Sequence, residues 1–221
     1  VWVPVAKKSI SYDANGGAGT SPQTQQFTPG VDTPTVASNI PPTLTRDGYT
    51  FAGWNTSANG SGTTYVGGDK YLGNTDVVLY AQWTFNNYAL IYDPNGGSGT
   101  APSRANYTVN AFPIVATTDL NRPGYRFSGW NTVKAGSGST YTAGDTYTVI
   151  PVVPALTSTL YAQWSLNNYS VFFNANGATG GSAHSTDTFT VVTAEVIPGN
   201  TGNLVKTGFT FDGWNTQADG S

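Results

Sequence analysis

Three copies of one nine-residue pattern constrain this chain more than any other feature of its sequence. The pattern Gly-Tyr/Phe-x-Phe-x-Gly-Trp-Asn-Thr occupies residues 48–56, 124–132 and 208–216. The tryptophans of the three copies are 76 and 84 residues apart. A period of about 80 residues exceeds the roughly 20–50 residues of solenoid repeats, and it is long enough for each copy to bury its own core. The sequence therefore predicts small domains in tandem.

Two further motifs recur in the same order and predict the boundaries of the repeats. A Tyr/Phe-x-x-Asn-Gly motif opens each repeat, and Leu-Tyr-Ala-Gln-Trp closes the first two at residues 79–83 and 160–164. The predicted organisation is the tail of a preceding repeat at 1–6, repeat 1 at 7–84, repeat 2 at 85–165 and an incomplete repeat 3 at 166–221. The joins at 84–87 and 165–168 are not rich in Gly, Ser or Pro, so we expect restricted angles between neighbouring repeats.

Apolar and polar residues alternate in the opening and closing motifs, which predicts β-strands. Gly53, with its equivalents at 129 and 213, is predicted to form a β-bulge that returns the following Trp to the aromatic face. Helical signals are weak, because segments 31–40 and 191–197 could hold one or two turns at most. Ten aromatic residues at repeated positions are predicted to form the cores: Trp54, Trp83, Trp130, Trp164, Trp214, Tyr12, Tyr92, Phe51, Phe127 and Phe211.

The composition excludes several classes of function. Nine Lys and Arg among twelve Asp and Glu give a net charge of −3, which cannot supply the broad basic face that nucleic acid requires. No apolar run approaches the roughly 18 residues of a membrane-spanning helix. The chain has no Cys and a single His, His184, so disulfides, thiolate catalysis and a His-rich metal site are not expected. We therefore predict no enzymatic activity, no catalytic residue, no cofactor and no metal.

A few polar residues at repeated positions remain as candidate sites. The openings at Asp13 and Asp93 are similar to the first half of a calcium loop, but an Asx turn is the favoured interpretation. His184 lies in a polar loop, where solvation is expected. Five residues are predicted as possible interaction sites, as a row of cations or as exposed rings: Arg46, Arg122, Lys206, Tyr80 and Tyr161. For the cations, the favoured interpretation is a side chain that packs its stem over an aromatic ring or lies in a solvated turn.

The three ordered motifs together resemble the Listeria–Bacteroides repeat, the B-repeat of internalin-type proteins. The resemblance covers nearly the whole chain. It implies a β-rich α+β fold, with small β-grasp-like, ubiquitin-like modules in an elongated tandem array. It also implies an extracellular location, at the surface or cell wall of a bacterium or secreted from it, with no catalytic residue and no cofactor.

Three functions from different classes are consistent with these observations. The leading one is a structural or adhesive stalk segment of a bacterial surface or secreted protein, which makes weak multivalent contacts with a host-surface or cell-surface protein or glycan. The alternative is a glycan-binding module that uses exposed aromatic rings. A third is a filament subunit, in which Val1–Val5 of one molecule completes repeat 3 of the next by head-to-tail association. The competing explanation for the unfinished ends is a fragment of a longer array.

Overall fold

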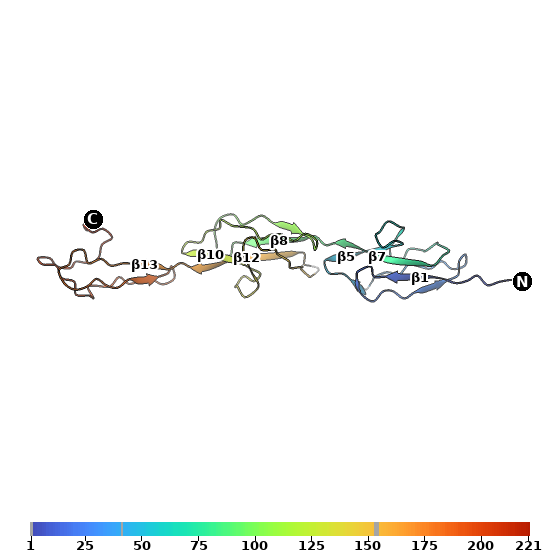
Figure 1. The fold of residues 1–221 in the computed structure, drawn as a ribbon, viewed down its shortest axis with the longest axis horizontal. Coiled ribbons are helices and arrows are strands. Elements are labelled where there is room, and N and C mark those ends of the chain that lie inside the picture. The colour runs from blue at the N-terminus through green and yellow to red at the C-terminus, as the bar shows by residue number, and fades with distance from the viewer. Residues whose placement is uncertain (1, 41, 153–154) are drawn as a thin grey trace. The chain divides into compact units, whose positions relative to one another are not determined.

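The computed structural model describes residues 2–40, 42–152 and 155–221, and all regular structure in these residues is β-strand (Figure 1). The fold is therefore all-β, and the expectation of an α+β fold is wrong. The segment between β3 (Gln25–Phe27) and β4 (Leu44–Thr45) shows why. Its prolines, such as Pro29 and Pro34, lack the amide proton that a helix needs and restrict the residue before them.

Repeat 1 contains one mixed five-stranded sheet in the order β3-β1-β7-β5-β6. Its strands are β1 (Lys8–Asp13), β3, β5 (Tyr49–Asn55), β6 (Thr64–Tyr65) and β7 (Val77–Phe85). The opening strand β1 runs parallel to the closing strand β7, and all other neighbours are antiparallel. Because β1 and β7 lie side by side, the two ends of the repeat are held together at the centre of the sheet.

The alternation predicted from the sequence places one face of each strand in the core. In β1, Ile10 and Tyr12 are buried, and in β7 the same is true of Leu79 and Ala81. The segment between β3 and β4 packs against this face and contributes Val36 to the core. Burial of apolar surface from strands distant in sequence is the main stabilising contribution to such a sheet.

The predicted bulge is confirmed in both complete repeats. The register between β5 and β7 shifts between Phe51 and Gly53, and Gly53 has a φ of 128°. The same shift occurs at Gly129 in β10 (Tyr125–Asn131), with a φ of 121°. As a result Phe51 and Trp54 lie on the same face, with ring centroids 5.1 Å apart. Without the extra residue, strict alternation would turn Trp54 to the opposite face.

Repeat 2 repeats this architecture strand for strand. Its sheet has the order β11-β10-β12-β8-β9, and the additional bounds are β8 (Tyr88–Asp93), β9 (Ala105–Tyr107), β11 (Thr140–Tyr141) and β12 (Thr157–Leu166). When this order is read from the other end, as β9-β8-β12-β10-β11, each strand corresponds to the strand of repeat 1 at the same place. Leu90, Tyr92, Tyr107, Trp130 and Leu160 are buried at the positions of Ile10, Tyr12, Phe27, Trp54 and Leu79.

Two compact units are distinguished along the chain, and each is described by itself. The first comprises residues 1–91, 103–115 and 144–159, and the second comprises residues 92–102, 116–143 and 160–221. A small sheet of β2 (Ala18–Gly19) with β4 belongs to the first unit, and one of β13 (Tyr169–Val171) with β14 (Asp187–Phe189) belongs to the second.

The two ends of the chain carry less regular structure. Among the described residues of repeat 3, the strands are β13 and β14. The third copy of the central motif, residues 208–216, does not form a strand there. Trp2, Val3 and Val5 are exposed and belong to no described strand. Val1 lies outside the described residues, so strand donation by Val1–Val5 stays a prediction.

Candidate interaction surface

The structure places the predicted tryptophans inside the repeats to different degrees. Trp54 and Trp130 have no exposed surface, so neither can stack on a ligand. Trp83 and Trp164 are half-buried, and their indole nitrogens donate to the carbonyl oxygens of Ala14 and Pro94, each at 3.1 Å. Trp214 of repeat 3 is half-buried and donates to the carbonyl oxygen of Pro198 at 2.9 Å.

The other predicted core aromatics surround these tryptophans. Tyr12 lies edge-on to Trp54 and Tyr92 lies edge-on to Trp130, in each case with centroids 4.8 Å apart. The Tyr12 hydroxyl accepts a hydrogen bond from the Ala37 amide, and burial raises the pKa of Tyr12 above its usual value. Phe51 and Phe127 are half-buried, whereas Phe211 is 39% exposed. Repeat 3 therefore exposes more of this ring than repeats 1 and 2 do.

The opening turns have the geometry of an Asx turn. The carboxylate of Asp13 accepts from the Asn15 amide, and Asp93 accepts from Asn95 in the same way, each at 2.7 Å. Within residues 2–40, 42–152 and 155–221, no group of three or more His, Asp or Glu side chains could hold a metal ion. The two aspartates therefore shape a turn in this structure.

Asparagines that were not singled out from the sequence organise each repeat. Asn15 has a φ of 47°, and its side-chain amide donates to the carbonyl oxygens of Ala58 and Ala81, each at 2.8 Å. The buried side chain of Asn55 donates to the Gly60 carbonyl at 3.2 Å and accepts from the Gly62 amide at 2.9 Å. The Asn that follows Trp in every copy of the central motif was the signal for this second role.

The three repeated cations lie over aromatic rings. Each stands at the first position of a turn whose fourth residue carries the ring, and the third residue is a glycine with positive φ. The guanidinium carbon of Arg46 lies 4.1 Å from the centre of the Tyr49 ring, and Arg122 lies 4.1 Å from that of Tyr125. The ammonium of Lys206 lies 5.1 Å from the Phe209 ring. Arg46 and Arg122 are half-buried and Lys206 is exposed.

The same cations pack against the opening turns. The Arg46 guanidinium lies against Gly16 and that of Arg122 lies against Gly96. In repeat 3, the ammonium of Lys206 donates to the Asn176 carbonyl oxygen at 3.2 Å. Each cation therefore bridges the opening and central motifs of its repeat, so the favoured interpretation of a side chain packed over a ring describes what the structure shows.

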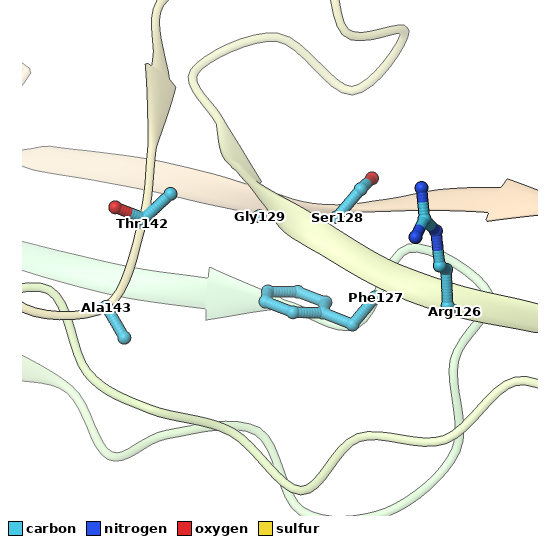
Figure 2. A pocket seen from close by; sticks show the side chains of 6 residues that line it. All are labelled: Arg126, Phe127, Ser128, Gly129, Thr142 and Ala143. Carbon is cyan, nitrogen blue, oxygen red and sulfur yellow. The ribbon is translucent and has the colours of Figure 1, made fainter.

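Tyr80 and Tyr161 are half-buried at equivalent positions of the closing strands β7 and β12. A separate shallow, open hollow in repeat 2 is lined by residues of β10 and of the segment after β11 (Figure 2). In Figure 2 the Phe127 ring extends to one side of β10, and the side chains of Arg126 and Ser128 extend to the other. An open hollow of this kind would leave a small molecule largely exposed, whereas ligand pockets bury most of the ligand surface.

His184 is less solvated than predicted. Its ring nitrogens lie 3.0 Å from the Thr201 hydroxyl and 3.0 Å from a carboxylate oxygen of Asp187. Its ring also meets Phe173 edge-on, with centroids 5.0 Å apart. These contacts connect the opening strand region of repeat 3 to the loop that carries Thr201.

The geometry defines a tandem-repeat protein with all-β modules, and comparison with known proteins places it in a family. The model of the Listeria-Bacteroides repeat domain matches residues 9–82, 88–163 and 169–221. The chain belongs to this family.

Three relatives show where such repeats occur. A protein named "Putative Gly-rich membrane protein" from Evansella cellulosilytica is 39% identical over 172 residues, which are 74% of this chain and 19% of the relative. A second membrane-protein relative from the same organism is 30% identical over 218 residues, or 96% of this chain and 29% of that protein. Internalin H of Listeria monocytogenes is 32% identical over 163 residues, or 69% and 27%. The chain thus spans less than a third of each relative.

The described residues contain no helix long and apolar enough to cross a membrane.

Proposed function

We propose that this chain is a structural segment of a bacterial surface or secreted protein, in which serial repeats support and present other parts of the protein. The observation that carries the proposal is that repeats 1 and 2 form the same five-stranded sheet around equivalent aromatic residues. Each of these repeats holds its opening and closing strands together and turns its largest aromatic side chain inward. Such modules suit a supporting role because each one can fold around its own core.

The module is further proposed to be a β-grasp variant without the helix. A β-grasp domain has a mixed sheet whose first and last strands are parallel neighbours at the centre, and β1 and β7 have this relation. In this chain the proline-containing segment after β3 takes the place of the helix and packs Val36 into the core.

A surface or secreted location is supported by the relatives, two of which are named as membrane proteins and one as an internalin. Weak multivalent contacts are proposed at the stacked cations Arg46, Arg122 and Lys206. Their geometry repeats from one module to the next, so an anionic surface would meet the same group several times along the chain.

The supporting role can be tested by display on a bacterial surface. The full chain is placed between a wall anchor and a reporter epitope, and it is compared with a chain in which residues 85–165 are removed. The proposal predicts that the shorter chain lowers access of a large antibody to the epitope, while access of a small nanobody is retained. Equal antibody access for both chains, at matched surface expression, would contradict it.

The glycan-binding alternative now depends on the half-buried Tyr80 and Tyr161, because Trp54 and Trp130 are inaccessible. A glycan array probed with the full chain tests it, with the double variant Tyr80→Ala and Tyr161→Ala as the control. Binding that disappears in the double variant favours this alternative. Binding that persists in that variant, or is absent from both proteins, counts against it.

A further inference from the structure

Gly48 of repeat 1 is in close contact with a valine of repeat 2. Gly48 is buried in the turn between Arg46 and Tyr49, with a φ of 82°. A Cβ built on this glycine would overlap Cγ1 of Val109. Val109 lies in the turn that follows β9, where the Ala111 amide donates to the Thr108 carbonyl oxygen at 3.1 Å. Both residues belong to the first compact unit.

The same contact recurs one repeat further along the chain. Gly124 occupies the equivalent turn of repeat 2, with a φ of 79°, and a Cβ on it would overlap Cγ1 of Val191. Val191 lies in the turn after β14, where the Thr193 amide donates to the Thr190 carbonyl oxygen at 3.2 Å. Gly124 and Val191 belong to the second compact unit. Two independent copies therefore have the same pairing.

The linkers between repeats are attached to the same two glycines. The amide of Asn86 donates to the Gly48 carbonyl oxygen, and the amide of Asn167 donates to that of Gly124, each at 2.9 Å. The Asn86 side chain also donates to the Tyr88 hydroxyl at 3.2 Å, and Tyr88 is a buried residue of repeat 2. Each glycine thus contacts both the linker and the following repeat.

We propose that this glycine and valine form an interaction surface that joins each repeat to the next one. The partner that fits the glycine turn is another repeat of this family. Its second strand, β9 or β14 in this chain, ends in an aromatic residue, and the contact needs a β-branched aliphatic residue two positions after that aromatic residue. That residue is Val109 after Tyr107, and Val191 after Phe189. The glycine is required here for two reasons: its positive φ, and the space that the valine methyl group occupies. This inference rests on the proposed supporting role, because a support must transmit force from one repeat to another.

Substitution of the glycine tests the contact, and a second glycine in the same repeat provides the control. Gly68 has a φ of 99° and would bring its Cβ within 4 Å of no other atom, so Gly68→Ala introduces backbone strain without a clash. In the full chain, Gly48→Ala should lower the Tm by about 4–8 °C more than Gly68→Ala does. Val109→Ala in the Gly48→Ala background should recover part of the difference. Equal losses for the two glycine variants, or no recovery, would overturn the proposal.

Distance measurements between spin labels test the contact between Gly48 and Val109 without the glycine variants. Because the sequence contains no cysteine, each label can be attached at a single introduced cysteine. Spin labels at the exposed positions Ala58→Cys and Ala135→Cys report on repeats 1 and 2. Val109→Ala should broaden their distance distribution, while a control pair at Ala135→Cys and Thr210→Cys on repeats 2 and 3 should be unchanged. An unchanged distance distribution between positions 58 and 135 would overturn the proposed contact between repeats. Because the repeats stay folded in this variant, that result would leave the display test of the supporting role intact.

Discussion

The indole nitrogen of Trp54 donates a hydrogen bond to the carbonyl oxygen of Ala37, 2.9 Å away, whereas the equivalent Trp130 has no such bond to any described residue. Both indoles have no exposed surface, and among the described residues Trp130 Nε1 has no hydrogen-bond partner. The bond ties the segment between β3 and β4, which contains Ala37, to strand β5. The two cores, built on equivalent positions, therefore differ in one buried polar interaction around the same tryptophan.

This difference predicts unequal effects of the same substitution. Trp54→Phe should destabilise the chain by about 1–3 kcal/mol more than Trp130→Phe, because only the first leaves a carbonyl oxygen without its donor. Both variants create a similar cavity, so the cavity cost cancels in the comparison. Urea unfolding followed by circular dichroism measures the two free energies. Equal values would show that the Ala37 bond contributes nothing.

Asn15 is predicted to stabilise repeat 1 through both its backbone and its side chain. Asn15→Ala should lower the free energy of unfolding by about 1–3 kcal/mol, because it loses the hydrogen bonds to Ala58 and Ala81. Alanine also adopts a positive φ less readily than asparagine does. Asn15→Gly keeps the backbone freedom and loses only the side-chain bonds, so it should be intermediate. Thermal unfolding of the three proteins ranks them. A glycine variant as stable as the parent would remove the side-chain contribution.

Gly53 is predicted to resist substitution because of its place in the bulge. A Cβ there would lie 2.8 Å from the carbonyl oxygen of Tyr65, at a φ of 128°. Gly53→Ala should therefore cost at least about 1–3 kcal/mol and reduce the near-ultraviolet circular dichroism of the core tryptophans. Gly213→Ala, at a φ of 137° and with no atom within 4 Å, is the matched control and should change the spectrum less. The reverse order would contradict the role assigned to the bulge.

The contact between β1 and Asp76, the residue before β7, is predicted to weaken in acid. Asp76 accepts from the Ser9 amide at 2.8 Å and pairs with Lys8 at 3.2 Å, and these contacts, led by the Ser9 amide, hold the pKa of Asp76 below its usual 3.8. Because the pKa is lower in the folded state, the stabilisation is fully present above pH 3.8 and is lost as the pH falls through the folded-state value.

Hydrogen exchange of the Ser9 amide measures this effect, since protection should decrease below pH 3.8, after correction for the intrinsic rate. In Asp76→Asn the protection should vary less with pH over the same range. A parent protein whose Ser9 protection stays constant over about three pH units around the carboxylate pKa would contradict the prediction.

Local patterns in the sequence account for much of the secondary structure. The alternation of Ile10 and Tyr12 with serines predicts a strand with one buried face, because successive side chains point to opposite sides. Gly53 predicts a bulge because few other residues adopt its backbone conformation. The recurrence of the central motif predicts tandem modules and the family. Each of these signals is contained in a few neighbouring residues.

Contacts between distant segments decided the rest. The parallel pairing of Tyr12 with Leu79 joins residues far apart in sequence, and no local pattern fixes that register. The absence of a helix in the described residues, the position of Arg46 over Tyr49 and against Gly16, and the meeting of Gly48 with Val109 also depend on how strands pack. Local conformational preference is enough to specify the repeat, its strands and its turns. Strand order and the glycine–valine contact follow instead from the folded chain, because they depend on which surfaces are buried together.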